Sequence, residues 1–376
     1  MSDVFETILG QPRVRDFLRT CVAHDRVSHA YLFVGSAGSN KTAAAYALAQ
    51  ALLCREGGCG ECDDCKKIIR KTHPDVHFYS PAGAQGYLVE QIREVVADAQ
   101  LAPIRASKKV YIIDRADLMG TSAANAFLKT LEEPPSNVVM VLLARTRESV
   151  LPTIVSRCQV VAFRHIPASE AAGILSQHTG ASLNEASIAI QVCGGSVTKA
   201  AKFLKSGERM VFRNKVLSVL DSLAVADDLD VLSKAGELVV DAKAPLDEVR
   251  REQEEALSDN ADFLQKGALK TLETRQKRAL SQMGFEYLRQ LTSIVRSWLR
   301  DVLAVCAAAS EMIINVDDAD KIAAAACRTD AARVCRALSR VDAADDAISY
   351  NVSPQLSIEA LLFEIREVLY GTGRCC

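Results

Sequence analysis

The segment between residues 35 and 42 constrains the fold of this chain more than any other, because it joins a short apolar run to a helical one. Its sequence is Gly-Ser-Ala-Gly-Ser-Asn-Lys-Thr; it follows the run Ala30–Val34 and precedes the run Ala43–Leu53. A strand, a loop of the form G-x-x-x-x-G-K-[ST] and a helix make up a phosphate-binding loop. Asn40 stands where this pattern has its last glycine. The sequence therefore predicts a phosphate-binding loop that lacks one glycine.

Such a loop can hold ATP and Mg²⁺. Its backbone N–H groups and the helix N-terminus form a concave, positive site for phosphate. Lys41 would contact the outer phosphates, and Thr42 would bind Mg²⁺. Asn40 tolerates a left-handed backbone better than most residues, but its side chain fills space that glycine leaves open. The alternative interpretation is an ordinary strand, turn and helix with an incidental Lys-Thr pair.

The first 165 residues alternate short apolar runs with helical ones, which predicts a parallel sheet flanked by helices. The runs are not interrupted by polar residues, as is typical of strands covered on both faces. The expected strands are Ala30–Val34, Val76–Ser80, Val110–Asp114, Val138–Leu143 and Gln159–Phe163. The expected helices are Lys41–Leu53, Leu88–Leu101 and Thr121–Leu131.

The rest of the chain is predicted to be helical. A small helical group is expected at Glu170–Thr179, Asn184–Val192 and Ser196–Leu204. The charged segment Asp247–Leu280 is interpreted as a solvated helix with a connecting loop, and Ser357 is expected to begin the last helix, through Tyr370. One apolar face follows helical spacing. Its members are Leu288, Leu291, Val295, Trp298, Leu299 and Val302.

Composition excludes several classes of protein. The formal net charge of −2 provides no bulk basic character for nucleic-acid binding, although a local basic patch remains open. Apolar runs stay well below the roughly 18 residues of a membrane span. The N-terminal residues do not form a basic-then-apolar signal sequence. We therefore expect a cytoplasmic protein without a membrane anchor, in two or three domains given its 376 residues.

Four of the twelve cysteines are clustered, as Cys54, Cys59, Cys62 and Cys65. In a reducing compartment such a cluster is more often a metal site than a set of disulfides. Four thiolates are the number that a tetrahedral structural zinc requires. The pattern predicts a zinc site, with free thiols or disulfides as the alternatives. The terminal Cys375 and Cys376 are expected to have no structural role.

Three further motifs bear on catalysis. Asp114 ends a predicted strand, where a carboxylate can position Mg²⁺, and the next residue is Arg115, which stays protonated and cannot act as a base. The run Leu128-Lys-Thr-Leu-Glu-Glu-Pro-Pro ends a helix with two prolines. Its glutamates, Glu132 and Glu133, are interpreted as a solvated helix end. Ser156-Arg157-Cys158 precedes the fifth predicted strand. The candidate nucleotide-binding residues are thus Gly35, Gly38, Asn40, Lys41, Thr42 and Asp114.

Over about residues 3–210 the order and spacing of these motifs resemble the bacterial replicative clamp-loader family. The shared motifs are Phe5-Glu-Thr-Ile-Leu-Gly-Gln, His29-Ala-Tyr-Leu-Phe-Val-Gly, the four-cysteine insert, His73-Pro-Asp, Ile92-Arg-Glu, the Leu128–Pro135 run and Ser156-Arg-Cys. The C-terminal half is similar mainly in position and helical character.

The resemblance implies an α/β plus all-α fold. An AAA+ phosphate-loop parallel sheet with helices would occupy residues 1–166, with the zinc insert at 54–65. A small helical lid domain would follow at 167–207, and a C-terminal helical bundle, or collar, domain at 208–376. The resemblance also implies a hetero-oligomer, a heteropentamer of this chain with gamma/tau and delta subunits, which opens the sliding clamp and places it on primed DNA.

Within that family, the sequence favours the delta-prime subunit of the DNA polymerase III clamp loader over the ATP-hydrolysing gamma/tau motor. Asn40 replaces the loop glycine, and Arg115 replaces the catalytic glutamate. The motor's γ-phosphate-sensing arginine after Gly195-Ser196 is replaced by Val197-Thr-Lys. We therefore expect no useful ATPase activity, and ATP with Mg²⁺ is a doubtful ligand.

The resemblance assigns Arg157 an in-trans role as an arginine finger at the ATP site of a neighbouring subunit. Without the resemblance, Arg157 would be taken for an ordinary surface or salt-bridged arginine. Two other classes remain open: an active ATPase of the gamma/tau or another AAA+ type, and a zinc-stabilised DNA-binding module without a nucleotide role.

Overall fold

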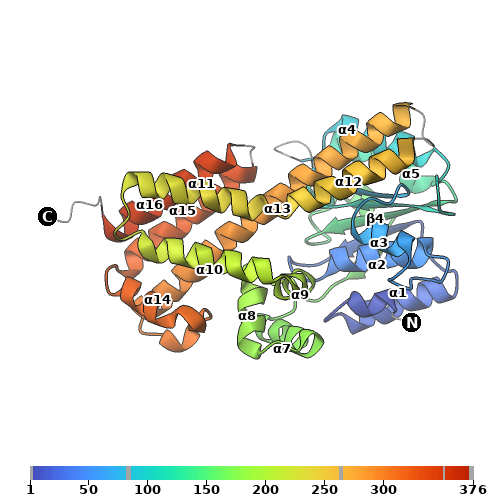
Figure 1. The fold of residues 1–376 in the computed structure, drawn as a ribbon. Coiled ribbons are helices and arrows are strands. Elements are labelled where there is room, and N and C mark those ends of the chain that lie inside the picture. Colours follow the sequence, from blue (N-terminus) through green and yellow to red (C-terminus); the bar gives the residue numbers. More distant parts are fainter. Residues whose placement is uncertain (1–2, 82–85, 262–265, 350–351, 372–376) are drawn as a thin grey trace. The chain divides into compact units, whose positions relative to one another are not determined.

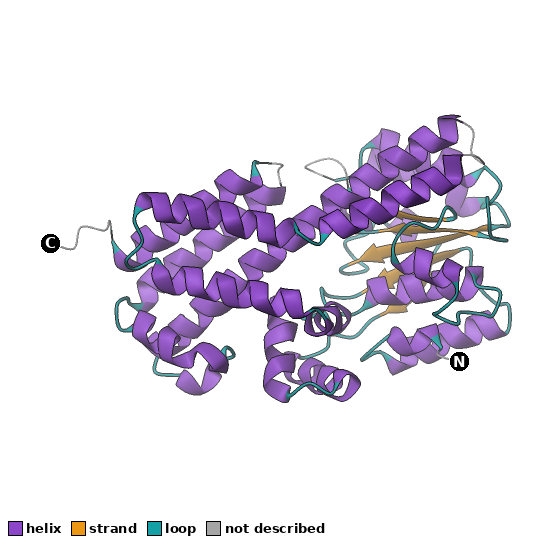
Figure 2. Ribbon diagram, viewed as in Figure 1, coloured by secondary structure: helices purple, strands orange, loops and turns teal. Residues whose placement is uncertain are grey.

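The apolar runs of the first half form a five-stranded parallel sheet in the computed structural model (Figures 1 and 2). The structure describes residues 3–81, 86–261, 266–349 and 352–371. The strands are β1 (Ala30–Val34), β2 (Val76–Tyr79), β3 (Lys109–Ile113), β4 (Val138–Ala144) and β5 (Gln159–Ala162). The predicted parallel sheet is confirmed, and each strand begins and ends within one residue of the expected position.

Strand β1 lies inside the sheet, in the order β2-β3-β4-β1-β5. Tyr31 pairs with Val141 of β4 on one side and with Gln159 of β5 on the other. After β1 the chain crosses to the far edge of the sheet and returns strand by strand to β4. The loop after β1 therefore begins where the strand order reverses, which is where open parallel sheets bind ligands.

Both faces of the sheet are buried, which explains the uninterrupted apolar runs. Tyr31 and Phe33 point into a core shared with α1, α2 and α3, and the alternate Leu32 points into a core shared with α4 and α5. Figure 1 shows these helices on the two sides of the sheet. The edge strand β5 is more exposed than the others.

The helices of this first unit are short. The α-helices are α1 (Pro12–Ala23), α2 (Lys41–Leu53), α3 (Asp63–Ile69), α4 (Val89–Ala99), α5 (Thr121–Glu132) and α6 (Pro152–Val155). Two 3-10 helices, η1 (Val4–Thr7) and η2 (Ala116–Leu118), lie before α1 and after β3. By backbone contacts the unit comprises residues 1–167 together with Ser196–Thr198.

In its described part, the second unit, residues 168–195 and 199–376, consists of helices and the loops that join them. Its α-helices are α7 (Ala168–Thr179), α8 (Leu183–Val192), α9 (Val197–Lys205), α10 (Gly207–Ser222), α11 (Asp228–Lys243), α12 (Leu246–Ala261), α13 (Lys266–Cys306), α14 (Ala319–Ala326), α15 (Ala331–Ser349) and α16 (Pro354–Tyr370). Two 3-10 helices, η3 (Ser310–Met312) and η4 (Val316–Asp318), precede α14. The division into three domains remains a prediction, since the backbone contacts separate the chain into two units.

Helix α13 forms the core of the second unit, packing against α10, α11, α14 and α15. The predicted apolar face from Leu288 to Val302 is buried, with Trp298 fully enclosed. Helix α16 begins at Pro354, three residues before the expected Ser357, because proline suits the first turn of a helix. The connecting loop expected near α12 falls partly outside the described residues, as do Cys375 and Cys376.

Across the described ranges, none of the helices is both long and apolar enough to cross a membrane.

Candidate functional site

The loop between β1 and α2 needs its first two glycines. A Cβ at Gly35 would lie 2.7 Å from Ser39 Oγ and 2.8 Å from Phe163 Cβ, which is too close for any side chain. Gly38 has φ of 80°, in the left-handed region that favours glycine. The loop thus keeps the sharp bend of a phosphate-binding loop.

Asn40 occupies the position of the missing glycine with φ of 66°, so its backbone keeps the conformation that glycine would adopt. Asparagine at the start of a helix ordinarily accepts an N–H from the first turn. Asn40 makes no such bond. Its Nδ2 donates to Leu9 O at 2.8 Å, and its Oδ1 accepts from Thr198 Oγ1 at 3.2 Å. The amide therefore joins the loop to two segments that are distant in the sequence.

Lys41 is turned back onto the loop. Its Nζ donates to Gly35 O at 2.9 Å and to Ser36 O at 3.1 Å. Burial lowers the pKa of this ammonium group, while the negative charge of Asp114 opposes that shift. Thr42 is exposed in the first turn of α2. The two residues that would contact phosphate and Mg²⁺ are present, and the ammonium is bonded to loop carbonyls.

Gln11 is a residue of this site that the sequence analysis did not single out as functional. Its Nε2 donates to Ser39 O at 3.1 Å and to Arg164 O at 2.8 Å, and its Oε1 accepts from Arg164 N at 3.2 Å. The side chain is 3% exposed. Gln11 therefore ties the N-terminal segment to the loop and to the residues that follow β5. Gln11 is the last residue of the motif that begins at Phe5, and nothing local in the sequence predicts these bonds.

The end of β3 places a cation where catalysis would require a base. Asp114 follows β3 directly, and its charge acts on Lys41. Arg115 adopts a left-handed backbone, with φ of 53°. Its Nε lies 3.6 Å from Asp117 Oδ2, and the Asp117 side chain is 9% exposed. The guanidinium thus forms an ion pair, without a hydrogen bond through Nε, with the partly buried carboxylate of Asp117.

The four clustered cysteines converge on one point. Their sulfur atoms all lie within 4.8 Å of one another, and Cys54 Sγ is 3.7 Å from the sulfurs of Cys59 and Cys62. A tetrahedral zinc with Zn–S bonds of about 2.3 Å would separate its sulfurs by about 3.8 Å. A disulfide needs about 2.05 Å. The cysteines are reduced in this geometry, and the donor set fits a tetrahedral metal ion.

Backbone N–H groups surround these sulfurs. The N–H of Cys62 points at Cys59 Sγ at 3.3 Å, and the N–H of Cys65 at Cys62 Sγ at 3.4 Å. Burial raises the pKa of the Cys54 thiol, but N–H groups from Cys59, Glu56 and neighbouring residues outweigh it and lower that pKa to about 6. Burial raises the pKa of Cys65 well above its ordinary value.

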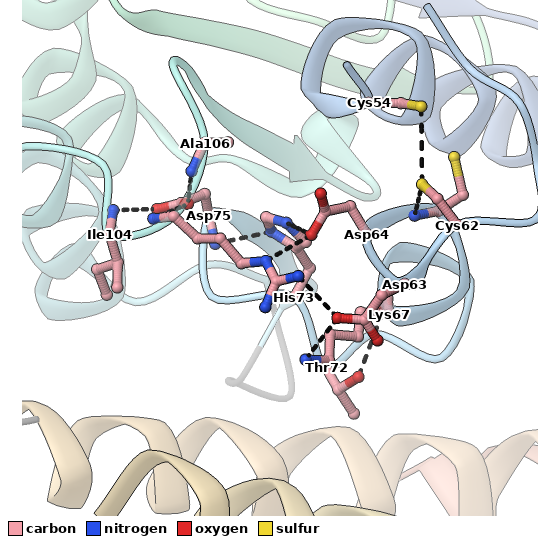
Figure 3. A network of polar contacts seen from close by, with 12 residues as sticks. Cys54, Cys62, Asp63, Asp64, Lys67, Thr72, His73, Asp75, Ile104 and Ala106 are labelled. Atoms are coloured by element: carbon pink, nitrogen blue, oxygen red, sulfur yellow. Dashed lines mark hydrogen bonds and ion pairs between the residues drawn. The ribbon is translucent and has the colours of Figure 1, made fainter. Parts of the chain in front are cut away.

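A polar network fixes the cysteine cluster to the sheet (Figure 3). Helix α3 carries Asp63 and Asp64, which accept from Arg105 Nη2 at 2.7 Å and Nε at 2.5 Å. Asp75 is fully buried and accepts from three successive N–H groups of residues 104–106, at 2.6, 2.7 and 2.8 Å. His73 Nδ1 accepts the N–H of Asp75 at 3.1 Å. The motif His73-Pro-Asp therefore holds the segment before β3 next to the insert.

Arg157 lies two residues beyond α6 and is about one-third exposed. Its Nη1 donates to Thr153 O at 2.8 Å. Its Nε donates to Glu132 Oε1 at 2.9 Å, and its Nη2 contacts the same oxygen. The residue that was interpreted as part of a solvated helix end therefore forms an ion pair with the candidate finger.

A family model described as "DNA polymerase III, delta subunit" matches residues 10–167, which contain the loop, the cysteine cluster and Arg157. This part of the chain is similar to subunits of DNA polymerase III. Among its relatives, the subunit delta' of Bacillus subtilis is 41% identical over 157 residues. The subunit tau of the same organism is 32% identical over 240 residues.

These matches are partial. They cover 41% and 63% of this chain, and 47% and 40% of the two relatives, so the chain spans less than half the length of either. A solved gamma subunit-related protein from Thermotoga maritima aligns over 94% of this chain with 19% identity and a TM-score of 0.41.

Proposed function

We propose that this chain is the delta-prime subunit of a bacterial DNA polymerase III clamp loader. It does not hydrolyse ATP at its own loop, and it supplies Arg157 to the ATP site of a neighbouring subunit. Arg115 is the observation that carries the proposal. A general base that activates water for attack on a phosphate must accept a proton, and the guanidinium of Arg115, which stays protonated, cannot do so.

The loop supports the same function. The candidate nucleotide residues Gly35, Gly38, Asn40, Lys41, Thr42 and Asp114 form a degenerate site in this proposal. Lys41 bonds to the carbonyls of Gly35 and Ser36, so that a phosphate would have to displace them. ATP and Mg²⁺ are therefore weak ligands, and binding without useful turnover remains within the proposal.

Arg157 is suited to act in trans because it is partly exposed and held only by surface contacts. A guanidinium that reaches a neighbour's γ-phosphate neutralises the charge that develops there during phosphoryl transfer. Its pair with Glu132 is half exposed, and exposed pairs of this kind are weak. The side chain can therefore exchange a carboxylate for a phosphate at low cost.

The cysteine cluster is proposed to bind one structural zinc ion through Cys54, Cys59, Cys62 and Cys65. Four thiolate ligands close the coordination sphere, which leaves no position for a reacting water. When bound, zinc would contribute free energy of folding to the insert. The ion pair between Asp64 and Arg105 would then hold the segment before β3 against the zinc-bound insert.

The function implies a cytoplasmic assembly with several partners. They are the gamma/tau and delta subunits, the sliding clamp, and primed DNA contacted through the assembly. The helices from 208 to 376 would form the collar that joins the subunits.

Two observations favour a second function, that of an ATP-hydrolysing gamma/tau subunit. The match to tau extends over 240 residues, against 157 for delta'. Lys41 and Thr42 are also both retained.

Steady-state hydrolysis by the purified chain separates the two functions. We expect turnover far below the roughly 1–10³ s⁻¹ of typical enzymes. Turnover of about 1 s⁻¹ or more that disappears in Lys41→Ala would assign the chain to the motor class.

The reconstituted loader tests the trans role. Arg157→Ala should leave assembly intact and lower ATPase activity in part, because the other ATP sites keep their own fingers. Lys41→Ala, the matched control in the same chain, should matter much less. An assembly that loses activity with Lys41→Ala but tolerates Arg157→Ala would refute the assignment.

A further inference from the structure

The missing glycine has been replaced by a residue that makes specific contacts. Asn40 is only 6% exposed, and both ends of its amide are bonded. An asparagine that merely tolerated the left-handed backbone would leave its amide in water or bond it to the first turn of α2. It does neither.

The two partners of Asn40 come from segments far from the loop. Leu9 lies 31 residues earlier, in the turn before α1, and Thr198 lies 158 residues later, at the start of α9. The Ser196–Thr198 segment belongs to the first unit, whereas the residues on either side of it belong to the second. A single side chain thus joins three stretches of chain around the loop.

Glycine at this position could not make these bonds. In a nucleotide-binding loop, the phosphates themselves organise the backbone N–H groups and the lysine. Here Gln11 bonds to Ser39 O, Asn40 to Leu9 O, and Lys41 to Gly35 O. These bonds hold the loop through its carbonyl oxygens, and they engage the ammonium of Lys41, which a phosphate would otherwise contact.

We propose that Asn40 closes this loop by acting as an internal link between Leu9, the loop and Thr198, in place of a bound nucleoside phosphate. The proposal rests on the proposed function in taking the loop not to turn over ATP. It adds the residue responsible: Asn40 determines whether the loop is closed on itself or open to a nucleotide.

Hydrogen exchange of the full-length chain tests the link. Asn40→Gly keeps the backbone conformation and removes both bonds, so amides in residues 9–11 and 196–198 should exchange about two- to tenfold faster, as expected for the loss of one net hydrogen bond each. Thr198→Val should speed exchange in residues 196–198 alone. Asn40→Asp keeps the acceptor and loses the donor, so it should affect mainly residues 9–11.

Binding of MgADP, measured by titration calorimetry, tests the closure. Asn40→Gly should bind MgADP at least about tenfold more tightly than the unaltered chain, because the nucleotide no longer has to break the link. Unchanged exchange in Asn40→Gly, or unchanged MgADP affinity, overturns the proposal. If Asn40→Gly does not fold, unchanged exchange in Thr198→Val overturns it instead. ATP turnover by the unaltered chain would contradict the proposed function, but it would not change the hydrogen-exchange result. The proposed function and the role of Asn40 can therefore be refuted independently.

Discussion

Arg157 and Glu132 meet at the surface of the first unit, where the Nε and Nη2 of the arginine both donate to a single carboxylate oxygen. Glu132 is the last residue of α5, and Arg157 follows α6, 25 residues later. The other carboxylate oxygen does not share in these bonds. The guanidinium therefore contacts Glu132 through one oxygen only and remains partly exposed to solvent.

Glu132→Gln should lower the free energy of unfolding by less than about 1 kcal/mol, since the ion pair is half exposed and screened by water. Glu133→Gln, at the adjacent exposed position, is the matched control and should have an effect within about 0.5 kcal/mol. Urea denaturation measures both. If Glu132→Gln lowered the free energy of unfolding by more than about 2 kcal/mol, the ion pair would be important for stability. Arg157 could then not leave Glu132 at low cost to contact a neighbouring subunit.

Protein purified without chelators should contain one zinc per chain. Cys62→Ser should reduce the zinc content and the melting temperature, because the site loses a ligand and with it part of the free energy of metal binding. Cys335→Ser, which alters an exposed cysteine outside the cluster, should change neither. Elemental analysis that finds no zinc, or a disulfide among the four cysteines in reducing buffer, would contradict this prediction.

His73 should titrate below the ordinary histidine pKa of about 6.5, because burial of the ring lowers its pKa despite the nearby charges of Asp75 and Asp64. The unfolded chain then binds a proton more readily than the folded one. The contribution of His73 to stability is complete above about pH 6.5 and is lost as the pH falls from there through the lower folded-state pKa.

An NMR titration of the imidazole resonances measures this pKa directly, and His73→Gln identifies the signal among the six histidines. A midpoint at or above 6.5 would show that the carboxylates, and not burial, control the ring.

Arg213→Met should destabilise the second unit by about 1–3 kcal/mol, because it leaves the buried side-chain oxygen of Asn315 unpaired and removes the ion pair with the exposed Asp317. The Arg213 side chain is 1% exposed, and its guanidinium bonds to Asp317 at 2.6 and 2.9 Å and to Asn315 at 2.6 Å. Lys215→Met is the control on the same helix. It removes an exposed pair with Glu237 and Asp241 and should cost about 1 kcal/mol or less. Equal effects in thermal unfolding would contradict the buried role of Arg213.

Local sequence determined the parallel sheet, the phosphate-binding type of loop and the cysteine cluster. Unbroken apolar runs specify strands buried on both faces, and β1 and α2 begin and end at the predicted residues. The spacing of Cys54, Cys59, Cys62 and Cys65 brings four thiols together, because all four lie close to one another in the sequence, between residues 54 and 65. These features depend on neighbours in the sequence, which a pattern can detect.

Only the tertiary structure decided which side chains meet across long separations. Asn40 was interpreted as a tolerated substitution, yet its amide bonds to residues 31 and 158 positions away. Glu132 was interpreted as a solvated helix end, yet it pairs with Arg157. Polar side chains carry no periodicity that points to a distant partner. Their pairing follows from how the strands and turns bring separate segments to the same edge of the sheet, and the sequence pattern does not contain that information.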